Sequence, residues 1–164
     1  MELYTTYYSS PLGLIEITGN DEGISAVYFV DERKNNSTKA HPSLKECVYQ
    51  LDEYFKGIRK EFGLKLNHSG TDFQKRVWEQ LLAIPFGKTV SYLDISKKLG
   101  DPNATRAVGN ANGSNPICII IPCHRIIGAS GKLVGYSGGL WRKEWLLNHE
   151  KSGSFGKQTN LFTN

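Results

Sequence analysis

An apolar run that stops at a proline and leads directly into a cysteine, a histidine and an arginine is the feature that most restricts this chain. Residues 117–121 are four isoleucines and one cysteine, and a run rich in β-branched residues predicts a short buried strand. Pro122 cannot donate a hydrogen bond to a strand ladder, so we expect the strand to end there. The break leaves Cys123, His124 and Arg125 together, just past the end of the strand.

These three side chains predict a nucleophilic cysteine at position 123. A nearby imidazole and a cation lower the pKa of a thiol and make the thiolate available. The alternative is a packed thiol, because unpaired cysteines are often simply buried, and we expect that for Cys47 and Cys118. Three cysteines in 164 residues do not form a disulfide framework, which favours a reduced, cytoplasmic protein.

The charges are spread unevenly along the chain. Residues 1–69 carry a net charge of −2 and residues 70–150 a net charge of +4. A basic half is typical of a protein that binds a polyanion, although an ordinary solvated surface is the alternative. No stretch approaches the roughly 20 apolar residues needed to cross a membrane, and the first residues lack a signal-peptide pattern. We therefore expect no membrane partner.

The N-terminal part predicts a small antiparallel sheet and one helix. Strand candidates cover residues 3–8, 14–18 and 24–30, with turns between them. Pro42 is expected to begin the helix. Its apolar face is formed by Leu44, Cys47, Val48, Leu51, Tyr54 and Phe55.

A boundary near residues 67–70 separates this part from a helical one. Thr71 and Gln74 have the spacing of a capping box, and Ser91 caps the next helix, which Gly100 ends. Asn103 is expected to cap a further helix from Ala104 to about residue 112. The last two helices predict a helix-turn-helix, with a plain helical hairpin as the alternative. The buried face of the first helix is expected to comprise Phe73, Val77, Trp78, Leu81 and Leu82.

The second helix of this pair has an unusual surface for a recognition helix that contacts base edges. Its only long charged side chain is Arg106. A single guanidinium on a smooth helix suits insertion into a duplex better than readout of several bases. The small residues that allow close approach are Ala104, Ala107, Gly109, Ala111 and Gly113.

Several short motifs together resemble one protein family. They are Pro122-Cys123-His124-Arg125, the preceding Asn115-Pro116, and the following Gly135-Tyr136-Ser137-Gly138-Gly139. In these motifs the chain resembles the methylated-DNA–protein-cysteine methyltransferases, also called O6-alkylguanine-DNA alkyltransferases, from about Thr71 to Glu150.

The resemblance implies an α+β fold in two domains. Residues 1–69 would form a ribonuclease-H-like domain with a small antiparallel sheet and one helix. Residues 70–150 would form a mainly helical, winged-helix-like domain that carries the helix-turn-helix, DNA binding and alkyl transfer. The composition of residues 151–164 predicts a flexible tail.

The resemblance also implies direct reversal of DNA damage. O6-alkylguanine would be flipped out of double-stranded DNA, and its alkyl group would pass irreversibly and stoichiometrically to Cys123. We expect a monomer without a cofactor. No Cys/His spacing indicates a metal site, so no metal is expected.

The family's chemical roles map onto individual residues of this chain. Cys123 would accept the alkyl group, His124 would act as its base through a water, and Glu150 would orient that imidazole. Asn115 would brace the turn, and Tyr92 would donate a proton to the leaving guanine and help turn the nucleotide out.

Further residues would bind the base and the DNA. Tyr136, Ser137 and Val134 would form the pocket loop, and the carbonyls of Cys123 and Ile126 would accept from the exocyclic amine. Arg106 would fill the gap in the base stack, next to the small residues Ala104, Ala107 and Gly109.

Three other functions compete with this reading. An alkyltransferase-like damage-binding module would transfer nothing, but such proteins lack the acceptor cysteine. A cysteine hydrolase would need an oxyanion hole, and a regulator would need a polar recognition helix and a dimer seam.

Glu150 could also be a solvated residue at a helix end, and Trp141 and Trp145 are expected to pack in the core under the last helix.

Overall fold

The computed structural model describes residues 2–34 and 41–152. The chain divides into two compact units, one made of Met1–Ser69 with Pro116–Cys118, the other of Gly70–Asn115 with Ile119–Asn164. A three-residue segment from the C-terminal half of the sequence therefore belongs to the first unit.

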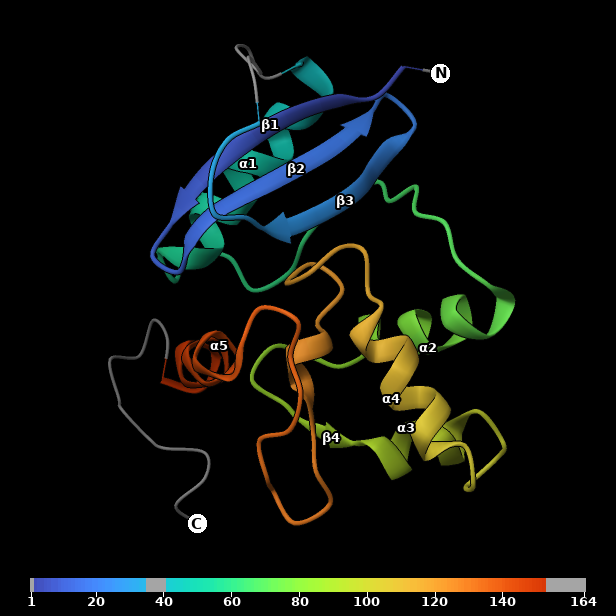
Figure 1. Cartoon of the computed structure of the whole chain (residues 1–164). Helices are drawn as coiled ribbons and strands as arrows, with labels where there is room; N and C mark the ends of the chain where they lie inside the picture. The colour runs from blue at the N-terminus through green and yellow to red at the C-terminus, as the bar shows by residue number, and fades with distance from the viewer. Residues whose placement is uncertain (1, 35–40, 153–164) are drawn as a thin grey trace. The chain divides into compact units, whose positions relative to one another are not determined.

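The first unit is a three-stranded antiparallel sheet with one helix on one of its faces (Figure 1). The strands β1 (Tyr4–Ser10), β2 (Gly13–Asn20) and β3 (Gly23–Phe29) lie in sequence order, as the alternating pattern predicted. The helix α1 (Pro42–Phe55) begins at its proline. Its buried side includes Leu44, Cys47, Leu51 and Tyr54, all fully buried.

The predicted strand over residues 117–121 is wrong, although the segment is buried as expected. Ile117 forms an isolated parallel bridge with Val27, in which the N–H of Cys118 donates to the Val27 carbonyl at 3.1 Å. The chain then turns, and Ile119 has a φ of 70°. A β-branched residue strongly disfavours this left-handed region, so the backbone at Ile119 is strained and cannot continue a strand.

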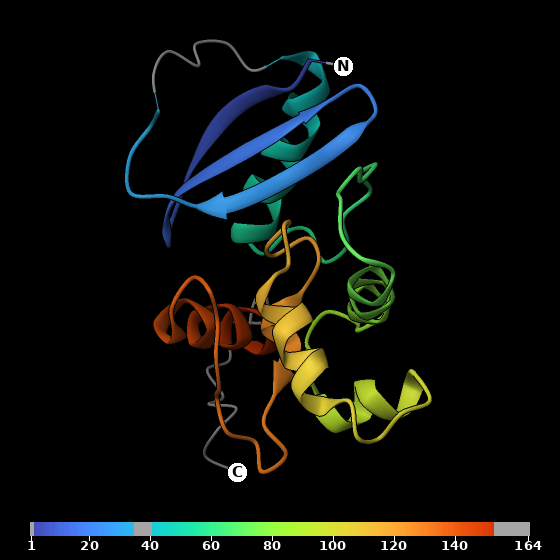
Figure 2. The same cartoon turned by 45° about the vertical axis from the view of Figure 1, so that its right-hand side comes forward.

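The second unit consists mainly of helices (Figure 2). They are α2 (Asp72–Leu82), α3 (Tyr92–Lys98), α4 (Thr105–Gly113) and α5 (Leu140–Ser152). A short strand β4 (Val90–Ser91) pairs in parallel with β5 (Ile126–Ile127), directly after a single 3₁₀ turn, Cys123–Arg125. This pairing places the end of the 3₁₀ turn beside the start of α3.

Local sequence chemistry explains where two of these helices begin. Thr71 and Gln74 form the predicted capping box of α2, and Ser91 forms an equivalent one with Asp94 on α3. In both, each side chain satisfies a backbone N–H that has no partner within the helix. Both starts of helices were therefore correctly predicted.

The start of α4 differs from the prediction. Its N-cap is Ala104, which makes no side-chain cap, and the helix begins at Thr105. The N–H of Asn103 donates instead to Oδ1 of Asp101 at 2.9 Å. Asn103 is therefore part of an Asx turn that begins at Asp101, in the connection between α3 and α4, and it is not the N-cap of α4.

Two large side chains expected in the core lie at the surface. Leu82 is 46% exposed and Trp141 is 58% exposed, whereas Trp145 is half-buried and stacks on His149. Both misplaced residues lie in terminal turns of their helices, where the buried face ends. The expected tail also begins later, because α5 includes Lys151, and residues 153–164 lie outside the described part of the chain.

No helix in the described part of the chain combines the length and the apolar composition that a membrane span needs.

Candidate active site

A pocket in the second unit brings together five of the residues expected at the site. Its lining comes from the 3₁₀ turn, from α3 and α4, and from the loop before α5. The expected site residues among its lining are Cys123, Tyr92, Tyr136, Ser137 and Gly109, although Gly109 was expected at the DNA surface. The other lining residues are Asn112, Gly113 and Gly135.

Cys123 is held in its turn by hydrogen bonds to the preceding segment. Its N–H donates to the Ile121 carbonyl at 2.7 Å, and Nδ2 of Asn115 donates to the same carbonyl at 2.7 Å. Asn115 is itself buried, and this bond joins it to the segment that leads into the turn.

The pKa of the Cys123 thiol differs from the expectation. Burial raises it to about 11, although a hydrogen bond with Asn115 and the positive charge of Lys143 both act to lower it. Desolvation disfavours the thiolate more than these two neighbours favour it. The thiol is therefore protonated at neutral pH in the free protein, and a base must remove its proton before it can attack.

His124 and Glu150 form a buried pair beside the nucleophile. Nε2 of His124 lies 2.6 Å from Oε2 of Glu150, and both side chains are almost completely buried. Burial lowers the pKa of His124, so the imidazole is neutral. Nε2 carries the proton because it faces a carboxylate. Nδ1 has no hydrogen-bond partner among the described residues and can accept a proton.

Arg125 has a different role from the one the sequence suggested. Its Nε donates to Oε1 of Glu150 at 2.8 Å, and its Nη2 donates to Oε2 at 2.9 Å. Burial opposes ionisation of Glu150, but His124 and Arg125 together hold its pKa well below the usual range. Arg125 therefore fixes Glu150 as a carboxylate, and does not act on the thiol directly.

Backbone groups complete the surroundings of this ion pair. Nη1 of Arg125 donates to the Ile84 carbonyl at 2.6 Å, and the N–H of Gly87 donates to Oε1 of Glu150 at 3.3 Å. Glu150 is 3% exposed, so it is not a solvated residue at the end of α5.

Lys143 is a site residue that the sequence reasoning missed. It is fully buried, and its Nζ donates to the carbonyls of Val134 at 2.7 Å and Gly135 at 3.1 Å. Burial lowers its pKa to about 8, and interaction with Cys123 acts in the opposite direction. Lys143 thus ties the pocket loop to α5 and supplies positive charge near the sulfur.

A signal for Lys143 was present in the sequence. It shares the buried side of α5 with Leu146, Leu147 and Glu150, at the i, i+3, i+4 and i+7 positions that mark a core face. A lysine on such a face is rarely buried without partners, and this spacing could have identified it.

Tyr92 lies at the start of α3 and faces the pocket loop. Its hydroxyl donates to the Val134 carbonyl at 3.4 Å. Burial raises its pKa, and interaction with Cys123 raises it further. The phenol therefore stays protonated at neutral pH and can serve as a proton donor.

Two expected base-binding residues are placed differently from the rest. Val134 contributes its carbonyl to the contacts with Tyr92 and Lys143, while its side chain is exposed. Ile126 is fully buried in β5, and it is not among the residues that line the pocket.

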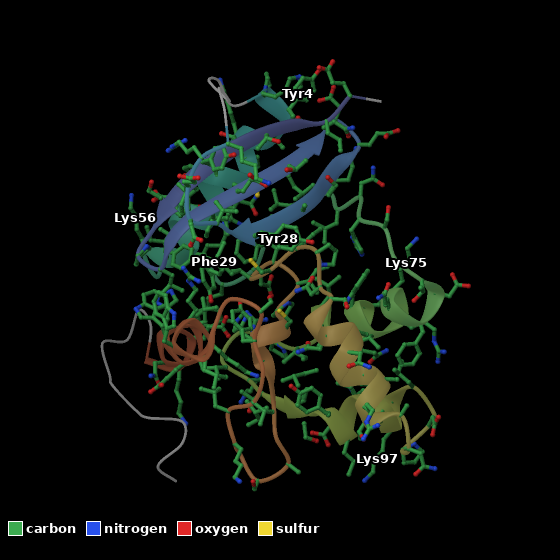
Figure 3. The ribbon with its side chains drawn as sticks, viewed as in Figure 1. Tyr4, Tyr28, Phe29, Lys56, Lys75 and Lys97 are labelled. Atoms are coloured by element: carbon green, nitrogen blue, oxygen red, sulfur yellow. The ribbon has the colours of Figure 1, made fainter. Side chains whose placement is uncertain are left out.

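The exposed side of the helix pair carries positive charge. Lys97 and Lys98 form the last turn of α3, and Arg106 and Ala107 are exposed on α4, next to the partly exposed Ala104. Figure 3 shows the side chains of Lys75 and Lys97 projecting from the surface of this unit. A Cβ added at Gly109 would lie 3.7 Å from the Tyr92 ring, an ordinary van der Waals contact, and Gly109 itself lines the pocket.

No cluster of three or more His, Cys, Asp or Glu residues in the described ranges, 2–34 and 41–152, could hold a metal ion.

Comparison with known proteins identifies the family over both parts of the chain. Residues 3–68 match the model of the ribonuclease-like domain of 6-O-methylguanine DNA methyltransferase, and residues 72–152 match the model of its DNA binding domain. The chain is 45% identical to the methylated-DNA–protein-cysteine methyltransferase of Methanosarcina acetivorans over 155 residues, which covers 92% of this chain and 99% of that protein. The Mycobacterium leprae protein of the same name is 47% identical over 146 residues, 87% of this chain and 88% of its own.

Solved structures agree with this assignment. The O6-methylguanine methyltransferase of Mycobacterium tuberculosis superposes with a TM-score of 0.84 at 44% identity, over 93% of this chain and 95% of that one. The Mycobacterium tuberculosis OGT in complex with DNA superposes with a TM-score of 0.82 at 45% identity, over 93% and 94% of the two chains. The α+β fold, with a ribonuclease-like part followed by a DNA-binding part, is confirmed, and the chain belongs to the 6-O-methylguanine DNA methyltransferase family.

Proposed function

We propose that this protein repairs O6-alkylguanine in double-stranded DNA by moving the alkyl group onto its own Cys123. The observation that carries the proposal is the position of this thiol in a pocket between α4 and the loop 134–139, beside the buried His124–Glu150 pair. Relatives named methylated-DNA–protein-cysteine methyltransferase, and a related structure in complex with DNA, support it.

The lesion must leave the duplex to reach the sulfur. The reactive carbon of an alkylated guanine is stacked inside the helix, and extruding a base costs a few kcal/mol, less when it is poorly paired. The exposed Arg106 on α4 would enter the gap and offset part of that cost. The small residues Ala104, Ala107 and Gly109 would let the helix backbone approach the DNA.

The proton acceptors and donors of the site suit displacement at an alkyl carbon. Nδ1 of His124 would take the Cys123 proton through a water, and Glu150 would stabilise the imidazolium that forms. The thiolate attacks the alkyl carbon, the carbon–oxygen bond breaks, and its electron pair moves into the guanine. Tyr92 would donate a proton to the ring as the base leaves, and the backbone N–H of Ser137 would lie near the guanine oxygen.

The chemistry predicts a single turnover. The product is a thioether, which has no carbonyl for water to attack, so the sulfur is not regenerated. One protein molecule therefore repairs one base.

Intact mass spectrometry tests this function. The protein is mixed with excess duplex containing O6-methylguanine, and we expect a mass gain of one methyl group per chain, mapped to Cys123 and absent in Cys123→Ala. A second turnover on fresh DNA would contradict the proposal. Binding of the lesion without any mass gain would instead indicate a damage-binding module.

The same proposal places the protein with the DNA, in the cytoplasm or, in a eukaryote, in the nucleus. None of the three cysteines forms a disulfide in the structure, which fits a reducing compartment. We further propose that it acts as a monomer and without a cofactor, because all the groups assigned to the transfer come from one chain.

A further inference from the structure

Asn112 is a pocket residue to which neither the sequence motifs nor the reaction scheme above gives a role. It lies near the end of α4, lines the pocket together with Cys123, and is 6% exposed. Its Nδ2 donates to the Cys123 carbonyl at 3.3 Å. That bond orients the amide, because only the nitrogen can donate to a carbonyl.

The oxygen of the same amide is left without a partner. Oδ1 of Asn112 is buried and makes no hydrogen bond to any described residue. A buried polar atom without a partner is uncommon and destabilising, so such atoms often point to a function. In a pocket lined by the nucleophile, a ligand that brings a hydrogen-bond donor would remove this penalty.

The chemistry of the flipped base limits what that donor can be. In O6-alkylguanine the ring nitrogens N1, N3 and N7 carry no hydrogen, N9 is bonded to the sugar, and the oxygen is alkylated. The exocyclic 2-amine is the one conventional hydrogen-bond donor on the base, and it has two hydrogens. The Cys123 carbonyl, which Asn112 holds, has a second lone pair that can accept one of them. The other is left for Oδ1 of Asn112 in place of the Ile126 carbonyl expected from the sequence, because Ile126 does not line the pocket.

We propose that Asn112 determines specificity for guanine, with its Oδ1 accepting a hydrogen bond from the 2-amine of the extruded base while its Nδ2 holds the Cys123 carbonyl. This inference rests on the proposed function, because it assigns a contact to the same substrate. It also predicts that 6-alkoxypurines without the amine are repaired poorly, since their binding leaves Oδ1 unpaired.

The experiment compares two substrates in single-turnover kinetics. One duplex carries O6-methylguanine, and the other carries O6-methylhypoxanthine at the same position, which differs only by the missing 2-amine. For the wild-type protein we expect the methylguanine rate to be higher. In Asn112→Leu, which has a similar size and no polar atoms, we expect the ratio of the two rates to fall by roughly tenfold, the value of one buried hydrogen bond.

A second variant separates the two ends of the amide. Asn112→Asp keeps an acceptor oxygen but loses the donor to the Cys123 carbonyl, so we expect slower transfer on both substrates and a ratio that stays close to that of the wild type. Asn110→Leu is the matched control, because it makes the same chemical change at an exposed position of α4, and its ratio should equal the wild-type value.

The outcomes distinguish the inference from the function on which it rests. An Asn112→Leu ratio equal to that of the wild type, with methyl transfer intact, would overturn the role of Asn112 alone. If wild-type protein transfers no methyl from methylguanine, the proposed function itself fails. Circular dichroism checks the folding of each variant, and Asn112→Ala, which also lacks a polar side-chain atom, replaces the leucine variant if that one does not fold.

Discussion

Both nitrogens on one side of the Arg125 guanidinium bind the carboxylate of Glu150, at 2.8 and 2.9 Å, in a site from which water is almost excluded. The same carboxylate also accepts from His124. In the proposed mechanism, the arginine of the Cys-His-Arg motif would thus act on the nucleophile only through two intermediaries, Glu150 and then the imidazole. This relay makes Arg125 a positioning residue and a stabilising one.

Removing that arginine should strongly destabilise the second unit. In Arg125→Met the Glu150 charge stays buried without its arginine partner, and we expect a loss of about 3–5 kcal/mol in the free energy of unfolding. Urea denaturation followed by tryptophan fluorescence measures this, because Trp78, Trp141 and Trp145 all lie in the second unit. The control is Arg76→Met, whose exposed guanidinium donates to the Leu99 carbonyl and should cost under about 1 kcal/mol. Equal effects of the two changes would refute the relay.

Lys143 should make the stability of the protein depend on pH in the alkaline range. Its pKa falls from 10.5 in the unfolded chain to about 8 in the fold, so between these values the unfolded state binds more protons and stability rises with pH. Relative to wild type, Lys143→Met should lose this rise between pH 8 and 10.5. Urea midpoints measured across that range provide the test, and parallel pH profiles for the two proteins would contradict it.

The same substitution should slow methyl transfer. Without Nζ, the carbonyls of Val134 and Gly135 lose their shared donor, and the pocket loop is no longer tied to α5. The sulfur also loses a nearby positive charge that lowers its pKa. We expect the single-turnover rate constant on methylguanine DNA to decrease by about tenfold or more, because the loss of one charge-assisted hydrogen bond corresponds to about that factor. A rate constant unchanged from wild type would exclude both effects.

The free thiol should react slowly with small electrophiles at neutral pH. Because burial raises the pKa of Cys123 to about 11, the thiolate fraction should increase about tenfold per pH unit from pH 8 to pH 10. Iodoacetamide labelling quantified by peptide mass spectrometry would follow this increase at the peptide that contains Cys123. Asn115→Leu removes a hydrogen bond that lowers this pKa, so it should label more slowly than wild type at each pH. A labelling rate that levels off near pH 8 would contradict the raised pKa.

Arg106→Ala should separate base flipping from chemistry. The side chain is exposed on α4 and is not among the residues that line the pocket, so reaction with free O6-benzylguanine should stay close to the wild-type rate. Transfer from duplex DNA should fall by about tenfold or more. Extrusion of the base costs a few kcal/mol, and without the Arg106 side chain no group fills the gap and offsets part of that cost. A single-stranded oligonucleotide with the same lesion serves as the control, because no stack has to be refilled. Equal losses on all three substrates would argue against insertion of Arg106.

Local sequence signals were sufficient for much of the framework. The capping boxes at Thr71 and Ser91 act between residues three apart, and the strands of the first unit follow a period of two along the chain. Cys123 was singled out from its neighbours His124 and Arg125, whereas Tyr92, Tyr136 and Ser137 were named from the resemblance to a family. Capping boxes and strand alternation depend on neighbours in the chain, so they can be recognised without knowledge of the fold.

The partners of the buried charges were decided by tertiary structure alone. The motif places Arg125 two residues from the thiol, yet the guanidinium binds Glu150 of α5, and Lys143 of the same helix supplies the charge near the sulfur. The burial that raises the pKa of Cys123 likewise comes from segments distant in sequence. Desolvation and ion pairing depend on what surrounds a group in space, and here helix α5 supplies two of the charges, Glu150 beside Arg125 and Lys143 near Cys123.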